Sequence, residues 1–170
     1  TTLSGITVRD HARSALDLGT GGGVQLLHLA RHTDRIVGTD VSERALRLAA
    51  LTLMLNDVEA DLRLGDRYAP VAAERFDLIV SNPPMVIGAG ARFTYRDAGF
   101  DGDAMSASVV ADSVQHLTET GRCQVLAHWV HIEGQDWRER VAGWVAPTGC
   151  DAWVVQREVL SPEEYVETWL

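Results

Sequence analysis

Short apolar runs alternate with longer amphipathic stretches along this chain of 170 residues. Runs of four to eight apolar residues bounded by Gly, Asp or Asn are typical of buried strands, and apolar residues at helical spacing predict helices. The predicted strands cover residues 14–18, 34–39, 59–64, 76–81, 123–129 and 151–156. The predicted helices cover residues 24 to about 32, 43–55, 104–118 and 136–145.

Strands and helices therefore alternate, and the central strands are continuous apolar runs. Residues 59–64 instead alternate between apolar and polar, which predicts a more exposed strand. This pattern is typical of a parallel sheet covered on both faces by helices. We expect a single domain of the α/β class: a Rossmann-like, doubly wound, mostly parallel sheet flanked by helices. Right-handed crossovers would place the carboxyl end of every strand at one edge, where ligands of open α/β sheets bind.

Polar residues follow the first, second, third and fourth predicted strands and should meet at this edge. The first group is Asp17-Leu18-Gly19-Thr20-Gly21-Gly22-Gly23, which leads into a helix. Its glycines allow a sharp turn and a close backbone approach to a ligand, and the helix start offers free N–H groups. A nicotinamide-type G-x-G-x-x-G fingerprint fits poorly, because its sixth position is Val24.

Two carboxylates stand at the ends of the next two strands. Asp40 lies at the distance expected for a group that accepts both hydroxyls of a ribose. Ser42 is a natural N-cap for the helix that follows, which would leave Asp40 free. Asp66 could accept from an adenine amino group, although a Gly-Asp pair after a strand is also a common turn.

The fourth strand ends in Asn82-Pro83-Pro84-Met85. The prolines lack N–H groups and have a fixed φ, so they predict a stiff tip. Such a tip offers one side-chain amide and carbonyl oxygens that can accept hydrogen bonds from an NH2 group. The long glycine-rich stretch that follows contains Tyr95, on which a base could stack or which could cover a substrate.

Composition narrows the class of protein. A net charge of −9 argues against coating nucleic acid by charge alone. No apolar run approaches the roughly 18 residues of a membrane span. Two cysteines without metal spacing are expected to be reduced core thiols in a cytoplasmic protein. We expect residues 1–170 to be one catalytic domain of a longer protein, because the first residue is Thr1 and the last residues read as an interrupted helix.

In order and spacing, these motifs resemble those of the class I S-adenosylmethionine-dependent methyltransferases. The glycine-rich turn resembles their D-x-G-x-G-x-G loop, and Asn82-Pro83-Pro84-Met85 resembles the [DNS]-P-P-[YFW] motif of the branch that methylates planar nitrogens. Within that branch the chain is most similar to HemK/PrmC-type glutamine methyltransferases and to related proteins with a methyltransferase small domain. It departs from them at Met85, which replaces an aromatic residue, and in lacking both the helical substrate-recognition domain and the seventh, antiparallel strand.

The resemblance implies that Asn82 and Pro83 accept the two N–H groups of the target and aim its nitrogen at the methyl group of S-adenosyl-L-methionine. Pro84, Met85 and Tyr95 would contact the substrate. The implied cofactor contacts are Asp17, Gly19, Thr20, Gly21, Gly23, Asp40, Val41, Asp66, Arg67 and Asn82. No metal is implied.

The substrate stays open between two classes. The HemK likeness and the acidic charge favour the amide of a protein glutamine, and the alternative is an exocyclic amine of adenine or guanine in RNA or DNA. A cofactor-binding module without activity is a further alternative. No membrane partner is expected, and the oligomeric state is not predicted.

Overall fold

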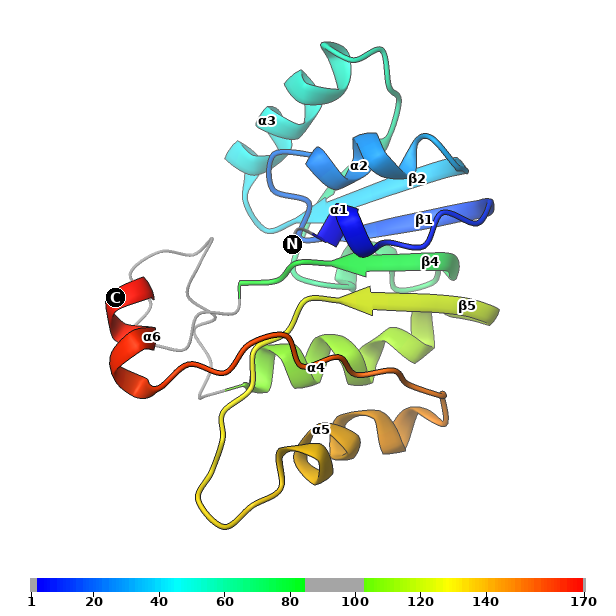
Figure 1. Ribbon diagram of the computed structural model, residues 1–170. Helices are drawn as coiled ribbons and strands as arrows, with labels where there is room; N and C mark the ends of the chain where they lie inside the picture. Colours follow the sequence, from blue (N-terminus) through cyan, green and yellow to red (C-terminus); the bar gives the residue numbers. More distant parts are fainter. Residues whose placement is uncertain (1–2, 85–102, 170) are drawn as a thin grey trace.

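A computed structural model describes residues 3–84 and 103–169. Its five strands form one sheet, in the order β3-β2-β1-β4-β5, and every neighbouring pair is parallel (Figure 1). The strands are β1 (Ala12–Leu18), β2 (Thr33–Asp40), β3 (Asp61–Leu64), β4 (Phe76–Ser81) and β5 (Leu117–Val125). The chain therefore has the predicted α/β class and a Rossmann-like sheet.

Helices cover both faces of this sheet. The helices are α1 (Leu3–Ile6), α2 (Val24–Leu29), α3 (Glu43–Met54), α4 (Ala104–Ser113), α5 (Trp137–Val145) and α6 (Pro162–Trp169). Three short 3-10 turns are η1 (Ala69–Val71), η2 (Val114–His116) and η3 (Ala146–Thr148). Most predicted helices and strands are therefore present, with ends that shift by a few residues.

Two apolar cores lie on opposite faces of the sheet, because successive residues of a strand point to opposite sides. On one face Ala15 of β1 packs with Leu26 of α2 and Leu53 of α3. On the other face Leu16 of β1 packs with Val109 of α4. Burying one such leucine or valine contributes roughly 1.5–3 kcal/mol.

β5 begins earlier than the predicted strand, and α4 ends earlier than the predicted helix. The register between β4 and β5 shifts between Phe76 and Leu78, so the pairing of these two strands is irregular there. Gly121 lies in this irregular part, where a Cβ atom would stand 2.7 Å from the carbonyl oxygen of Phe76. Residues 114–116 stay helical as the 3-10 turn η2, whereas Leu117 and Thr118, predicted as the end of the helix, belong to β5, which pairs with β4.

The prediction of a strand at 151–156 was wrong. These residues are not assigned to any regular element, and Trp153 is 98% exposed. An apolar run becomes a strand only where a neighbouring strand supplies hydrogen-bond partners, and no described strand pairs with this one.

Helix α3 is followed by Asp57 in the left-handed region (φ 53°). The expectation of two core thiols was wrong for one cysteine. Both cysteines are free thiols, but Cys150 is exposed and is not a core residue.

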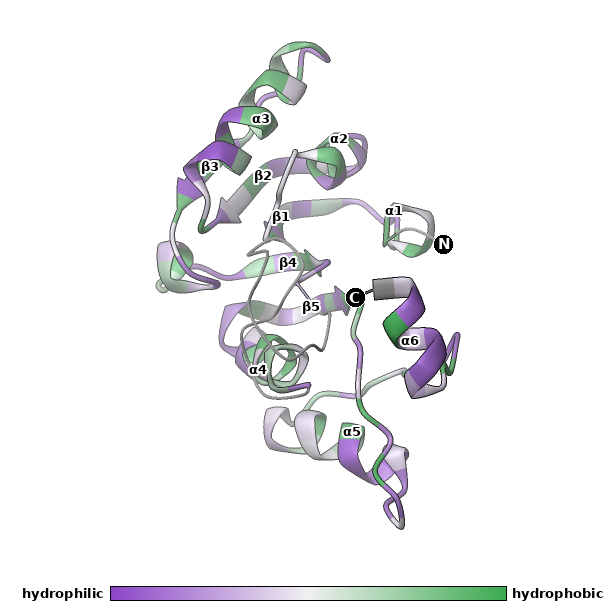
Figure 2. Ribbon diagram, turned by 90° about the vertical axis from the view of Figure 1, so that its left-hand side faces the viewer, coloured by the Kyte–Doolittle hydropathy of each residue, from purple (hydrophilic) through white to green (hydrophobic). Residues whose placement is uncertain are grey.

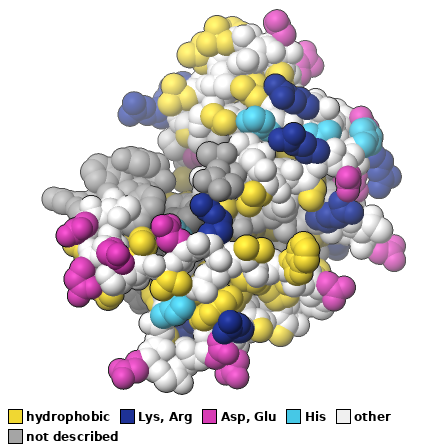
Figure 3. Space-filling model, viewed as in Figure 1, with side chains coloured by type: hydrophobic (Ala, Val, Ile, Leu, Met, Phe, Trp, Pro, Cys, Tyr) yellow, Lys and Arg dark blue, Asp and Glu magenta, His cyan; other side chains and the backbone are white. Residues whose placement is uncertain are grey.

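Helix α6 lies beyond the carboxyl ends of β4 and β5 in Figure 1, and Figure 2 shows it to one side of β5. Its Glu163, Glu164 and Glu167 are exposed, and acidic side chains gather over this helix on the surface (Figure 3). In the described part of the chain, no helix has the length and apolar character needed to cross a bilayer.

Candidate functional site

The carboxyl ends of the five strands meet at one edge, which faces the viewer in Figure 2. Leu18 at the end of β1 is in register with Thr39 of β2 and with Ser81 of β4. Asp40 is likewise in register with Leu64, and Ser81 with Val125. The register therefore brings the glycine-rich turn, Asp40, Asp66 and Asn82 to the same edge, as predicted.

The glycine-rich turn adopts a backbone that only glycine adopts readily. Gly19, Gly21 and Gly23 have φ values of 74°, 53° and 82°. The N–H groups of Gly19 and Thr20 both donate to the carbonyl oxygen of Thr39, at 2.9 Å. Among the described residues, a Cβ atom on Gly19 or Gly21 would meet no atom within 4 Å, so the described part of the chain leaves this side of the turn open to a ligand.

Gly23 has a second, steric reason to be a glycine. A Cβ atom there would stand 3.0 Å from the Cα atom of Ala49, so Gly23 lets the start of α2 approach α3 closely.

Asp17 is a buried carboxylate beneath this turn, with 1% of its surface exposed. Its pKa is raised to about 7, chiefly by burial and to a smaller extent by the negative charge of Asp40. A hydrogen bond of 2.6 Å, donated by the Thr20 hydroxyl, acts in the opposite direction. A cationic ligand group nearby would stabilise the charged form of Asp17.

Asp40 joins the turn to the end of β2. Its Oδ2 atom accepts from the N–H of Gly21 at 2.9 Å, and its Oδ1 atom accepts from the N–H of Ser42 at 2.8 Å. Ser42 is the N-cap of α3, as predicted, because its hydroxyl accepts from the N–H of Ala45. The expectation that this would leave Asp40 free was wrong, although each carboxylate oxygen keeps a further lone pair for a ligand. Val41, beside it, is 59% exposed.

Asp66 lies in the turn after β3, and 66% of its side chain is exposed. The N–H of Gly65 donates to the carbonyl oxygen of Asp40 at 2.9 Å, which brings the two predicted carboxylates onto neighbouring strand ends. Arg67 follows in the left-handed region, with φ 45°. Its side chain extends to α4, where it donates to the Ser108 hydroxyl at 3.1 Å.

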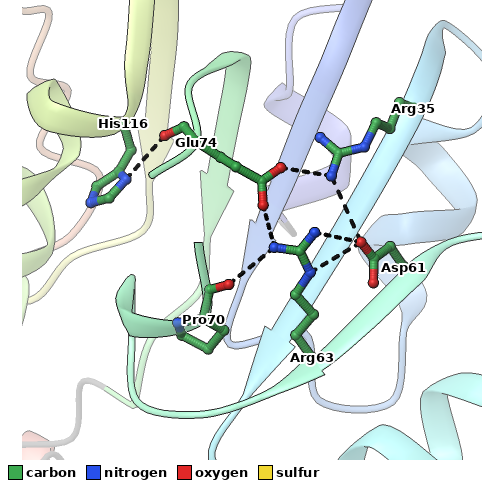
Figure 4. Close-up of polar contacts among 6 residues, drawn as sticks. All are labelled: Arg35, Asp61, Arg63, Pro70, Glu74 and His116. Atoms are coloured by element: carbon green, nitrogen blue, oxygen red, sulfur yellow. Dashed lines mark hydrogen bonds and ion pairs between the residues drawn. The ribbon is translucent and has the colours of Figure 1, made fainter. Parts of the chain in front are cut away.

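A polar network holds the other end of this turn (Figure 4). Arg63 donates to Asp61 at 2.6 and 3.0 Å, to the carbonyl oxygen of Pro70 at 3.0 Å and to Glu74. Arg35 of β2 completes the network with a 2.7 Å bond to Glu74. The network therefore ties β2, β3 and the chain before β4 around the segment that carries Asp66.

The Asn-Pro-Pro tip is anchored by the residue before it. The Ser81 hydroxyl donates to the carbonyl oxygen of Leu18 at 2.8 Å, and the Ser81 carbonyl accepts from the N–H of Leu126 at 3.0 Å. Pro83 is buried, whereas Asn82 is exposed beside the glycine-rich turn. Pro84 is partly buried. A buried proline on an anchored strand end gives a rigid base for the Asn82 amide.

The other predicted substrate contacts, Met85 and Tyr95, lie outside the described residues. Among residues 3–84 and 103–169, no group of three or more His, Cys, Asp or Glu side chains could hold a metal ion.

Sequence reasoning missed the side chains that support the site. Ser81 and Thr39 are buried polar residues in apolar strands, a signal that could have indicated their anchoring role. Ser108 and Asp112, by contrast, lie on α4 and have no sequence feature that links them to Arg67.

Comparison with known proteins gives the family. The model of the methyltransferase small domain matches residues 2–133. The release factor glutamine methyltransferase of Aliivibrio fischeri is 34% identical over 133 residues, which are 72% of this chain and 46% of that protein. The ribosomal RNA small subunit methyltransferase C of an Escherichia coli strain is 32% identical over 125 residues, 72% of this chain and 33% of that protein.

A solved structure agrees. The T. thermophilus 16S rRNA N2 G1207 methyltransferase, in complex with AdoMet and guanosine, superposes with a TM-score of 0.54 at 27% identity, over 67% of this chain and 28% of that one. The chain spans only about a third to a half of the length of the first curated relatives it matches. The shared fold, the motifs at the sheet edge and the family match together show that this chain belongs to the methyltransferase small domain family.

Proposed function

We propose that this chain is a catalytic domain that methylates a planar nitrogen with S-adenosylmethionine, and that the nitrogen belongs to the side-chain amide of a protein glutamine. The observation that carries the proposal is the exposed Asn82 on an anchored, proline-stiffened tip beside an open glycine-rich turn. Family membership supports the reaction class.

The acceptor end of the site follows from the chemistry of the amide. An amide nitrogen is a poor nucleophile because its lone pair is delocalised into the carbonyl group. In our proposal, the Asn82 side-chain oxygen and the Pro83 carbonyl each accept one N–H of the target, which favours a tetrahedral nitrogen and orients its lone pair. Both acceptors also stabilise the positive charge that develops on nitrogen, so no side-chain base is needed before transfer.

The cofactor end uses the other strand tips. When bound, S-adenosylmethionine supplies an electrophilic methyl group on a sulfonium. The backbone of the Gly19–Gly23 turn would lie against the cofactor. Asp17, to which the Thr20 hydroxyl donates, would face the positively charged end of the cofactor. Asp40 and Val41 would lie at the ribose, and Asp66 with Arg67 at the adenine. The free lone pairs of Asp40 and the exposure of Asp66 fit these roles.

A protein substrate is favoured by charge and by the relatives. The net charge is −9, and exposed acidic side chains gather on α6 at the same edge (Figure 3). A phosphate backbone would be repelled there, whereas a basic protein surface would be attracted. Three of the first four relatives are named release factor glutamine methyltransferases.

The second candidate is an exocyclic amine of a nucleic-acid base. The similarity to ribosomal RNA methyltransferases, one of them solved with guanosine, favours it. The same two acceptors would bind such an NH2 group, so the tip alone does not distinguish the candidates.

The test is methyl transfer from labelled S-adenosylmethionine into a cell extract, followed by protease or nuclease digestion. We expect protease to release the label, whereas release by nuclease would replace the glutamine proposal with the base proposal. The Asn82→Ala variant should lose about 10²-fold or more in transfer, as for other transition-state hydrogen-bond groups, and should keep most of its affinity for S-adenosylhomocysteine. Retained transfer by this variant would refute the role of Asn82.

A matched variant tests the cofactor end. Asp40→Ala should weaken binding of S-adenosylhomocysteine by about tenfold or more, because a charged acceptor of two hydrogen bonds is lost. If calorimetry shows that the wild-type chain binds NAD and neither S-adenosylmethionine nor S-adenosylhomocysteine, the methyltransferase proposal fails.

A further inference from the structure

The turn that carries Asp66 is attached to α4 by the residue next to it. Arg67 is one of only two non-glycine residues with positive φ in the described part of the chain. Side chains disfavour this conformation, so it persists where the surroundings hold it in place. The contacts of Arg67 and of its neighbour Tyr68 supply that restraint.

The guanidinium of Arg67 lies between two carboxylates. Its Nε atom is 3.5 Å from the carboxylate of Asp66, and its Nη1 atom is 3.5 Å from that of Asp112 on α4. Nη1 also donates to the Ser108 hydroxyl at 3.1 Å, and that hydroxyl in turn donates to the carbonyl oxygen of Met105. Ser108 is therefore oriented as an acceptor for Arg67.

The backbone around Arg67 is fixed independently. The buried Thr39 hydroxyl donates to its carbonyl oxygen at 3.4 Å, and the Tyr68 hydroxyl donates to the carbonyl oxygen of Val109 at 3.0 Å. Tyr68 is buried, so its bond to α4 holds the turn whether or not Arg67 keeps its guanidinium. What the guanidinium adds is a restraint on the exposed carboxylate of Asp66.

We propose that Arg67 is a positioning residue for recognition of the adenine amino group: anchored on Ser108 and Asp112, its guanidinium orients the Asp66 carboxylate. This inference rests on the proposed function, because it takes Asp66 as the acceptor of that amino group. In this proposal the Arg67 side chain contacts α4 and Asp66, and it does not contact the cofactor directly.

The proposal predicts a change in selectivity, which a merely structural role would not produce. The probes are S-adenosylhomocysteine and S-inosylhomocysteine, which carries a carbonyl oxygen in place of the 6-amino group. The wild-type chain should prefer the adenosyl compound, because an acceptor such as Asp66 pairs with an amino group and repels a carbonyl oxygen.

The central variant is Arg67→Asn, because asparagine tolerates the left-handed conformation and lacks the guanidinium. We expect the ratio of the two dissociation constants to fall by about three- to tenfold, the size expected for loss of a charged restraint at a partly exposed site. Asp66→Asn should reduce the ratio at least as far, and the double variant should add little to it. Arg67→Lys should restore part of the ratio, since an ammonium group can still pair with Asp66.

Arg122→Ala is the matched control, because Arg122 pairs with Asp10 at 2.6 Å away from this turn and should leave the ratio unchanged. An unchanged ratio in Arg67→Asn, with Asp66→Asn altered, would overturn the positioning role. An equal loss of affinity for both probes would also overturn it, because that result indicates general damage to the turn. If the wild-type chain binds neither probe, the proposed function itself has failed.

Discussion

Replacing Asp17 with Asn should stabilise the folded chain at neutral and alkaline pH. Asp17 has a pKa raised from 3.8 to about 7 in the folded protein, chiefly by burial. Between these two values the unfolded chain has lost the proton and the folded chain has kept it, so stability falls as pH rises through this window. The penalty is absent below about pH 4 and complete above about pH 7.

The magnitude follows from the size of the shift. One pKa unit corresponds to about 1.4 kcal/mol, so the full shift corresponds to about 4 kcal/mol. A measurement from pH 5 to pH 8 covers only the part of this shift between pH 5 and pH 7, which corresponds to about 2–3 kcal/mol in the free energy of unfolding. Asparagine keeps an oxygen that can accept from the Thr20 hydroxyl and has no charge to bury, so the variant escapes this penalty.

Urea unfolding of both chains from pH 5 to pH 8 measures the effect. The stability of Asp17→Asn relative to the wild type should increase with pH by about 2–3 kcal/mol, with equal m values. Asp77→Asn is the control. Burial alone would raise the pKa of Asp77, but hydrogen bonds from Thr118 and Arg13 outweigh it and hold the pKa below its usual value. That variant should therefore be less stable than the wild type throughout the range.

The ionisation of Asp17 should also affect the binding of the cofactor product. A cationic ligand selects the ionised form of Asp17, of which the free protein holds roughly a tenth at pH 6 and about nine-tenths at pH 8. Affinity for S-adenosylhomocysteine should therefore rise by up to about tenfold over this range in the wild type and not in Asp17→Asn. A stability difference that stays constant with pH would show that Asp17 is already ionised near its ordinary pKa, and the reasoning would be wrong.

Two further substitutions test the residues that support the site. Gly23→Ala should lower the free energy of unfolding by about 2 kcal/mol or more, because it combines a left-handed φ of 82° with a contact of 3.0 Å to the backbone of Ala49. Gly22→Ala, where the described residues leave room for a Cβ atom, should lower it much less, and equal melting temperatures for the two variants would contradict this. Glu74→Ala removes two partly exposed ion pairs and should cost roughly 1 kcal/mol, or about 2–4 °C in melting temperature. The pKa of Glu74 is lowered because hydrogen bonds from arginines outweigh its burial, so the stability it adds is present above its unfolded pKa and is lost as pH falls through the folded pKa. A double-mutant cycle with Arg63→Ala should give a coupling energy of about 0.5–1 kcal/mol at neutral pH, and a value of zero would show that the contact adds no stability.

The positions of the strand ends could be read from the sequence because they depend on local properties. The fourth strand has the predicted bounds, Phe76–Ser81, since an apolar run closed by Asn-Pro-Pro has one natural end. The turn at Gly19–Gly23 was equally local, because its positive φ values require glycine. Because the carboxyl ends of parallel strands lie at one edge of a sheet, the proximity of Asp40, Asp66 and Asn82 could then be predicted.

What only the tertiary structure decided depends on partners that are distant in sequence. The apolar run at 151–156 has the composition of a strand but no described strand to pair with, so it is not one. Arg67 contacts Asp112 because the fold packs α4 against the turn after β3. The raised pKa of Asp17 likewise arises from burial under neighbouring strands and from the charge of Asp40, which no reading of residues 12–18 alone could supply. Local sequence thus set which groups stand at the strand ends, and packing set their charge, orientation and support.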